Sequence, residues 1–156
     1  MDSIGIGERR LVCKECGTPF TRVEFGIGDY GTFAYQTQSG ERAFLFSLED
    51  PVFDEVKDLF DDVLAGRAGE PLEDHVRHDA LLEALVLTVD PAASGEEYFE
   101  SEKAPCPRCG STSVRVIQAP EDAPYIDVPA ESVTHRRWAA LSEDEKRSRI
   151  RSVIDA

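Results

Sequence analysis

The chain has 156 residues, of which 41% are hydrophobic, and this length and composition are typical of one compact domain with its own core. No apolar run reaches the length of a membrane span. The net charge of −14, from 31 acidic and 17 basic residues, opposes binding to nucleic acid and to anionic membranes and favours a basic partner. The same acidity is also consistent with solubility or with adaptation to high salt, so charge alone does not establish a partner.

The first part of the chain is predicted to form β-strands. Short strands are expected at residues 10–12 and 20–25, on either side of a cysteine-containing turn. Two further strands are expected at residues 32–36 and 43–48, separated by the polar, turn-forming sequence of residues 38–41.

A helix is predicted to follow these strands. Asp50 is a suitable N-cap residue, Pro51 suits the first helical position and Gly66 is a suitable end. The apolar residues between them recur at helical spacing: Val52, Phe53, Val56, Leu59, Phe60, Val63 and Leu64. A second helix is predicted from Pro71, and the almost continuously apolar residues 81–89 either complete it or turn into a strand.

The C-terminal part is predicted to contain one strand, one loop and one helix. Residues 112–118 have strand character, and residues 119–129 form an acidic sequence interrupted by prolines that is typical of a loop. Ser142 and Glu145 have the spacing of a capping box, which predicts a helix from there to about Ile154.

The four cysteines of the chain form two Cys-x-x-Cys-Gly motifs, at residues 13–17 and 106–110. They are Cys13, Cys16, Cys106 and Cys109. Two residues between paired cysteines let one tight turn direct both sulfur atoms to the same point, and the following glycine tolerates the positive φ of such a turn. The motifs therefore predict a tetrahedral site for one Zn²⁺ ion, with no coordination position left for a substrate.

Two other uses of the cysteines are less consistent with the sequence. Residues 1–10 contain no apolar run typical of a signal peptide, which favours a cytoplasmic protein with reduced thiols over a disulfide framework. A redox-active pair usually lies at a helix N-terminus, whereas a β-type sequence follows Cys16.

The distance between the motifs is unusual, because 89 residues lie between Cys16 and Cys106. Loop closure costs about 0.6 kcal/mol for each doubling of length, so this loop costs about 1.4 kcal/mol more than one of roughly 18 residues. A structural zinc ion contributes about 10–16 kcal/mol of binding free energy, which exceeds that cost. One ion can therefore join the two pairs, and the alternative is that each pair supplies half of a site across a dimer.

Residues 13–17 and 105–111 resemble the two knuckles of a zinc ribbon, and the second is close to the usual Cys-Pro-x-Cys-Gly turn of that family. The resemblance covers about thirty residues. It implies Zn²⁺ bound by the four cysteines and a β-hairpin at each knuckle. It implies no function, because ribbons occur in transcription factors, ribosomal proteins, enzymes and adaptors. The long insertion departs from the family pattern and puts any transfer of nucleic-acid binding in doubt.

The expected fold is α+β, a split zinc ribbon with additional strands in a single domain over residues 1–156. The ribbon halves are residues 10–25 and 104–118. The inserted strands and helices are residues 26–103, and a C-terminal helical segment is residues 130–156.

Two other motifs are explained more simply as structural features. Residues 26–31 spell a glycine-rich dinucleotide fingerprint, but the strand-like sequence from Thr32 lacks the helix N-terminus that binds the phosphates, so no dinucleotide is expected. His75 and His78 lie one helical turn apart, beside Asp74 and Asp79. They form either a second metal or acid–base site or a solvated helix face, and the lack of a further ligand favours the face.

Two charged surfaces are candidate partner sites. The predicted first helix carries an acidic face of Asp54, Glu55, Asp58, Asp61 and Asp62. The C-terminal segment is basic, with Arg136, Arg137, Lys146, Arg147, Arg149 and Arg151. Trp138 among these residues either stacks on a ligand or packs in the core.

The sequence thus favours a non-catalytic, acidic, zinc-binding module that binds a basic protein, for instance as an inhibitor of a toxin. The sequence indicates neither a nucleophile–base pair nor an open metal site, so it does not favour an enzyme. The alternative is a nucleic-acid-associated regulator that uses the basic C-terminal helix. The sequence predicts no oligomeric state.

Overall fold

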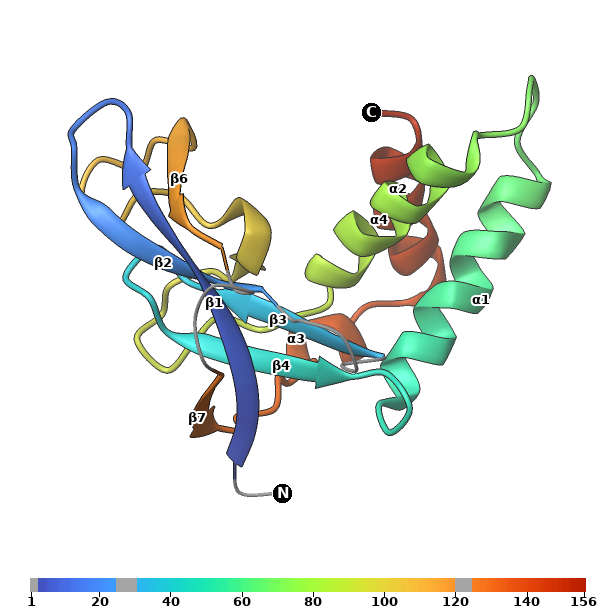
Figure 1. Cartoon of the computed structure of the whole chain (residues 1–156). Coiled ribbons are helices and arrows are strands. Elements are labelled where there is room, and N and C mark those ends of the chain that lie inside the picture. Colours follow the sequence, from blue (N-terminus) through green and yellow to red (C-terminus); the bar gives the residue numbers. More distant parts are fainter. Residues whose placement is uncertain (1–2, 25–30, 120–124) are drawn as a thin grey trace. The chain divides into compact units, whose positions relative to one another are not determined.

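The computed structural model describes residues 3–24, 31–119 and 125–156 and confirms the α+β class (Figure 1). The chain divides into two units, and each is built from two separate stretches of sequence. The ribbon unit consists of residues 1–46 and 91–133, and the helical unit consists of residues 47–90 and 134–156. The expectation that residues 1–156 behave as one domain stays a prediction.

The first sheet of the ribbon unit is built around the long strand β1 (Figure 1). Its strands are β1 (Ser3–Cys13), β2 (Pro19–Glu24), β6 (Val114–Gln118) and β7 (Ile126–Pro129). β1 pairs antiparallel with β2 and with β6 in the order β2-β1-β6, and β7 pairs with the N-terminal end of β1. The predicted ribbon strands on both sides of the first knuckle and after the second are therefore present.

Two sequence-based expectations about this sheet are wrong in extent. The strand expected at residues 10–12 begins at Ser3, and residues 126–129 of the expected loop form β7. Glycine disfavours strands, so Gly5 and Gly7 concealed the start of β1, while the pairing with β7 stabilises it. Ile6 is fully buried there and packs with Val23 and Phe44.

The second sheet of the ribbon unit comes from the insertion between the knuckles. It has the order β4-β3-β5 and consists of β3 (Thr32–Gln36), β4 (Arg42–Phe46) and β5 (Phe99–Glu100). A 3₁₀ turn, η1 (Ser101–Lys103), follows β5 and leads to the second knuckle. The Ser101 hydroxyl donates to the Val23 carbonyl oxygen at 2.9 Å, and Arg22 Nε donates to the Ala104 carbonyl oxygen at 2.9 Å. These bonds attach the approach to the second knuckle to β2.

The helical unit combines the two helices of the insertion with those of the C-terminal segment. Its helices are α1 (Pro51–Ala65), α2 (Asp74–Val86), α3 (Arg136–Ala139) and α4 (Glu143–Ile154). Their buried side chains include Val56, Leu59, Phe60, Leu85, Trp138 and Ile150. α1 has the predicted Asp50 cap and proline start, and α4 has the predicted capping box with both of its hydrogen bonds.

The second helix starts later than expected, its end agrees with one of the two expected alternatives, and the short helix α3 was not expected. α2 begins at Asp74, three residues after Pro71, and it continues to Val86, so residues 81–86 are helical and form no strand. The short α3 contains Trp138, whose ring is 1% exposed. Trp138 therefore packs in the core of the helical unit and offers no face for stacking.

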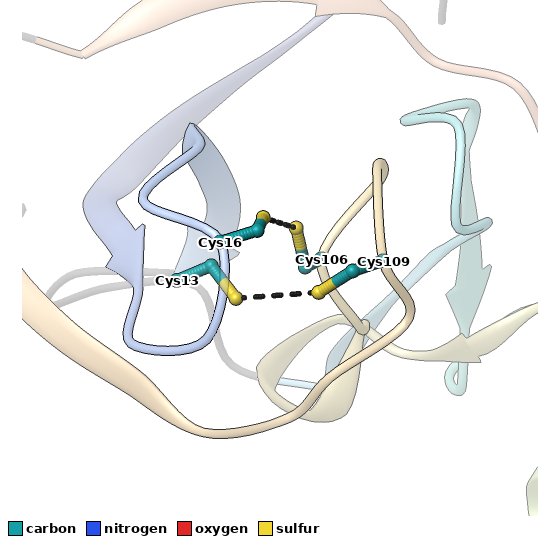
Figure 2. Close-up of side chains that lie close together, drawn as sticks. All are labelled: Cys13, Cys16, Cys106 and Cys109. Atoms are coloured by element: carbon teal, nitrogen blue, oxygen red, sulfur yellow. Dashed lines mark hydrogen bonds between the residues drawn. The ribbon is translucent and has the colours of Figure 1, made fainter.

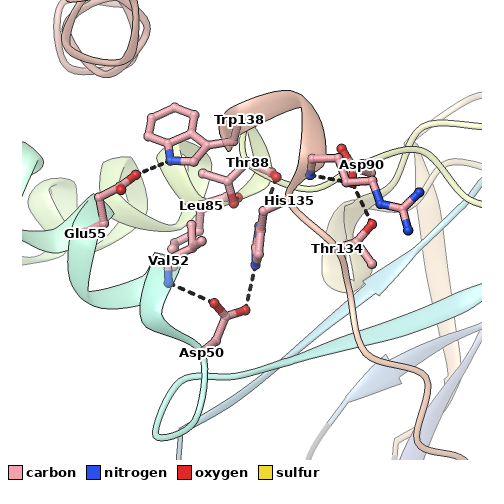
Figure 3. A network of polar contacts seen from close by, with 10 residues as sticks. Asp50, Val52, Glu55, Leu85, Thr88, Asp90, Thr134, His135 and Trp138 are labelled. Atoms are coloured by element: carbon pink, nitrogen blue, oxygen red, sulfur yellow. Dashed lines mark hydrogen bonds and ion pairs between the residues drawn. The ribbon is translucent and has the colours of Figure 1, made fainter. Parts of the chain in front are cut away.

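A polar network of mostly half-buried side chains joins the start of α1 to the segment before α3 (Figure 3). His135 Nε2 lies 2.6 Å from Asp50 Oδ2, and His135 Nδ1 lies 3.0 Å from the Thr88 carbonyl oxygen. Asp90 accepts hydrogen bonds from the Thr134 hydroxyl at 2.6 Å and from the backbone N–H groups of Arg136 and Arg137 at 2.7 and 2.9 Å. The network fixes where the C-terminal segment joins the helical unit.

Among the helices of the described ranges, none combines the length and the apolar composition needed to cross a lipid bilayer.

Candidate metal centre

The two knuckles have the same backbone hydrogen bonds. Cys13 N–H donates to the Thr18 carbonyl oxygen at 3.0 Å, and Gly17 N–H donates to the Cys13 carbonyl oxygen at 2.9 Å. In the second knuckle the corresponding bonds run from residue 106 to residue 111 at 2.8 Å and from residue 110 to residue 106 at 2.9 Å. Gly17 and Gly110 have φ values of 75° and 76°, the left-handed region that glycine adopts most readily. Each turn is thus closed as the motifs predicted.

The ribbon sheet brings the two knuckles together. β1 ends at Cys13, which is in register with Val114 at the start of β6. Lys14 N–H donates to the Ser113 carbonyl oxygen at 2.9 Å and continues the contact between the two turns. Gln38 Nε2 adds a bond of 3.1 Å to the Cys106 carbonyl oxygen from the β3–β4 turn. The sequence reasoning did not identify Gln38, and nothing in its local pattern signals this role.

The four cysteine side chains point toward one another from the two turns (Figure 2). Cys13 Sγ lies 3.5 Å from Cys109 Sγ, and Cys16 Sγ lies 3.6 Å from Cys106 Sγ. All four sulfur atoms lie within 4.8 Å of one another. Sulfur atoms bound to one tetrahedral zinc ion at about 2.3 Å are about 3.8 Å apart, so the donor set fits such an ion. One chain supplies all four ligands, and no second copy is needed to complete the site.

Hydrogen bonds to the first knuckle favour the thiolate forms that bind metal. The hydroxyl and the backbone N–H of Thr18 lower the pKa of Cys16 to about 6. The backbone N–H of Cys16 is the main cause of a lowered pKa at Cys13. At Cys109 the Ser111 backbone N–H acts in the same direction, but contact with the Cys13 sulfur and burial outweigh it and raise the pKa to about 12. Contact with the Cys13 sulfur thus opposes ionisation of Cys109, and a metal cation bound at the site would stabilise its thiolate form.

The centre lies at the edge of the ribbon unit. Cys13 and Cys106 are buried, at 1% and 0% exposure, whereas Cys109 is exposed. All four thiols are free. Four sulfur ligands fill a tetrahedral coordination sphere, which is the arrangement of a structural site and leaves no position for water activation.

The other candidate ligands do not form a second centre in the described structure. His75 Nδ1 lies 3.4 Å from Glu73, and both side chains are more than 70% exposed. Among the described residues, only the four cysteines form a cluster of three or more potential metal ligands. His75 and His78 therefore lie on a solvated part of α2.

The glycine-rich fingerprint falls mainly on residues 26–30, which lie outside the described residues. The next element is the strand β3, beginning at Thr32. A strand and not a helix N-terminus is thus the next described element after the fingerprint, and the absence of dinucleotide binding stays a prediction.

The predicted acidic and basic surfaces contact each other within the helical unit. Glu55 Oε1 accepts a hydrogen bond from Trp138 Nε1 at 2.5 Å (Figure 3). It also accepts one from Lys146 Nζ at 3.0 Å. Asp61 pairs with Arg77 at 2.5 Å, and Asp62 pairs with Arg147 at 3.3 Å. These carboxylates thus already have cationic partners in the same unit.

Asp54 and Asp58 are the remaining members of the acidic face. Both are exposed, and neither forms an ion pair with another residue in the described ranges. The surface that remains open to a partner is therefore narrower than the sequence suggested.

No protein-family model, no curated protein and no solved structure matches the chain.

Proposed function

We propose that this protein is a non-catalytic interaction module whose ribbon unit is held together by one zinc ion. The observation that carries the proposal is the convergence of four cysteine sulfur atoms from two turns of matching geometry. A site of four thiolates is typical of zinc or of an iron–sulfur centre, and the knuckle form resembles a zinc ribbon. Free thiols in such a site are consistent with a reducing, cytoplasmic environment.

Metal analysis together with native mass spectrometry of the purified full chain tests the metal. We expect one zinc ion per chain, lost in Cys106→Ser, because three thiolates and a hydroxyl bind zinc more weakly. Ser152→Ala on α4, an exposed serine outside the ribbon unit, is the control and should retain the ion. A fully folded preparation that contains no metal, or a Cys106→Ser variant with full zinc content, would refute the proposal.

We further propose that the helical unit presents an acidic face to a basic protein partner, such as a toxin that it neutralises. Its 17 acidic and 9 basic residues support this proposal, since a net negative surface accelerates encounter with a basic protein. Asp54 and Asp58 are the most available members of the face, because the other three carboxylates contact cations of the same unit.

Affinity purification from the native host, followed by binding measurements at two salt concentrations, tests this partner. Asp54→Lys/Asp58→Lys should weaken binding by about tenfold or more, and added salt should reduce the difference. Glu70→Lys/Asp79→Lys places the same charge change on exposed positions outside α1 and should retain affinity. Equal affinities of the wild type and the α1 variant for the partner would exclude the acidic face as its binding site.

The nucleic-acid alternative has less support. Lys146 and Arg147, central to the basic segment, already bind carboxylates of α1 and α4. Binding phosphate would require these bonds to break.

A further inference from the structure

The basic side chains of the ribbon unit fall into two groups. Arg9, Arg22, Arg42 and Lys103 are each engaged by a carboxylate or a carbonyl oxygen of the same unit. The other four are exposed, and none forms an ion pair or a side-chain hydrogen bond with another residue in the part of the chain that the structure describes. These are Arg10, Lys14, Arg108 and Arg115, which we call the ribbon cations. These four all lie in or beside the ribbon strands and knuckles.

The strand register places two of the ribbon cations on one face of the sheet. Arg115 is paired with Val12, and Arg10 lies two residues before Val12 on β1. The register between β1 and β6 shifts at Arg10 and Leu11, but β1 pairs with β2 without a shift from Gly7 to Val12, so Arg10 projects from the same side of β1 as Val12 and Arg115. Leu11 and Cys13 project from the opposite side and are buried.

The other two ribbon cations lie in the turns. Lys14 follows Cys13 directly, and Arg108 lies between the cysteines of the second knuckle. Glu15 is an exposed carboxylate beside Lys14, so the charges in this region are mainly, but not only, positive.

Strand β6 adds an open edge beside these cations. It pairs with β1 on one side, and no other described strand pairs with it. Two neighbouring aliphatic side chains of β6, Val116 and Ile117, are 47% and 50% exposed. An exposed strand edge offers main-chain hydrogen bonds to another extended segment, and aliphatic side chains on it add contact area.

We propose that β6 is a docking edge for an extended, acidic segment of a partner protein. The main chain of that segment pairs with β6, its carboxylates meet the ribbon cations, and its apolar side chains contact Val116 and Ile117. This site is independent of the acidic face of α1, which belongs to the helical unit. Charge complementarity determines the partner class: among the described residues at this edge the four ribbon cations outnumber the one unpaired carboxylate, Glu15, although the chain as a whole is negative.

A peptide fits this edge better than a nucleic acid does. The ribbon unit has 14 acidic and 8 basic residues, so its overall field repels a polyanion with closely spaced phosphates. A short acidic segment carries fewer charges and supplies the amide and carbonyl groups that complement a strand edge.

Selection from a displayed library of random dodecapeptides against the full, zinc-loaded chain tests the proposal. We expect enriched peptides to alternate Asp or Glu with aliphatic residues, because alternate side chains of a strand share a face. A synthetic peptide with the enriched sequence should bind about tenfold more weakly to Arg10→Glu/Arg115→Glu, and its affinity should fall with salt. Lys57→Glu, a single charge reversal at an exposed lysine of α1, should bind the peptide as the wild type does.

The variants need a folding control and an alternative ligand. Zinc content and circular dichroism report whether the charge reversal is folded; if it is not, Arg10→Gln/Arg115→Gln removes the charges without repulsion. Val116→Ser/Ile117→Ser should also weaken the binding of the peptide. The proposal is overturned by a lack of enriched peptides, by enrichment of basic ones, or by equal affinity of folded charge variants. An oligothymidylate that binds the wild type and not the charge variants would assign the edge to nucleic acid, and this result would also overturn the proposal.

Discussion

Asp50 and His135 are 85 positions apart in the sequence, and their side chains lie 2.6 Å apart in the helical unit. The two carboxylate oxygens of Asp50 have different partners: Oδ1 accepts the Val52 N–H at 2.9 Å and caps α1, while Oδ2 contacts His135 Nε2. The other nitrogen of His135 faces the Thr88 carbonyl oxygen. A carboxylate and a carbonyl can only accept, so both contacts are satisfied when both ring nitrogens carry hydrogen. One aspartate therefore links the start of α1 to the segment before α3.

The two roles of Asp50 can be separated by substitution. Asn remains a good N-cap, whereas Ala removes both the cap and the contact with His135. We expect Asp50→Ala to lower the free energy of unfolding by about 1 kcal/mol more than Asp50→Asn does. Urea unfolding followed by circular dichroism measures both values. Equal losses for Asn and Ala would show that capping contributes nothing here.

Glu55 is expected to contribute to stability as well as to surface charge. Removing its side chain leaves the buried indole N–H of Trp138 without its acceptor, at a cost of about 1–3 kcal/mol for Glu55→Ala. Asp58→Ala, on the same helix but with no ion pair among the described residues, should change stability by less than about 0.5 kcal/mol. Thermal or urea unfolding of the two variants measures the contrast. Equal stability of both would mean that the Glu55–Trp138 contact has no net effect.

The contacts of Asp90 predict that part of the free energy of unfolding is lost at acid pH. Burial alone raises the pKa of this carboxyl, but the Thr134 hydroxyl, the backbone N–H groups of Arg137 and Arg136 and the Arg137 guanidinium together hold it below its usual range. A lowered folded-state pKa gives stability that is complete above the unfolded value of about 3.9 and is lost as the pH falls through the folded value.

Substitution of Asp90 should therefore have a pH-dependent effect. Asp90→Asn should cost about 1–3 kcal/mol at neutral pH, through the loss of hydrogen bonds to a charged group. The difference from the wild type should shrink as the pH falls below about 4. Unfolding measured across an acid pH series checks this, and a difference that is constant with pH would show that the Asp90 charge is not its source.

The positive φ of Gly17 gives a test of knuckle geometry. No atom lies within 4 Å of the position that a Cβ would take there, so Gly17→Ala introduces backbone strain alone, worth about 1–2 kcal/mol. Gly66 at the end of α1 has a φ of −85°, and Gly66→Ala should be neutral or slightly stabilising. Zinc competition with a chelator and thermal unfolding measure both variants. Unimpaired zinc binding and stability in Gly17→Ala would contradict the proposed knuckle strain.

The features that the sequence predicted well are encoded locally. The capping box of Ser142 and Glu145 lies within one helical turn, and α4 begins directly after Ser142. The spacing within each Cys-x-x-Cys-Gly motif likewise determines a single turn, so the convergence of Cys13, Cys16, Cys106 and Cys109 required only that the two turns meet.

The features that it missed depend on distant partners. The first residues of β1 are stabilised by β7, more than a hundred residues later, and no local pattern around Gly5 predicts that pairing. Sequence spacing gives no indication that Glu55 meets Lys146 or that Asp62 meets Arg147, so the sequence predicts the acidic face of α1 and the basic C-terminal segment as two separate surfaces.

The interleaving of the two units determines an order of events during synthesis. The chain passes from one unit to the other three times, after residues 46, 90 and 133. Ribosomes add about 5–20 residues per second, so Cys13 and Cys16 precede the second cysteine pair by about 4–18 seconds. During that interval the growing chain contains only two of the four cysteine ligands. α1 and α2 are synthesised in the same interval, whereas α4 is synthesised later. The ribbon can close only after its second knuckle has left the ribosome, and the helical unit can be completed only after that.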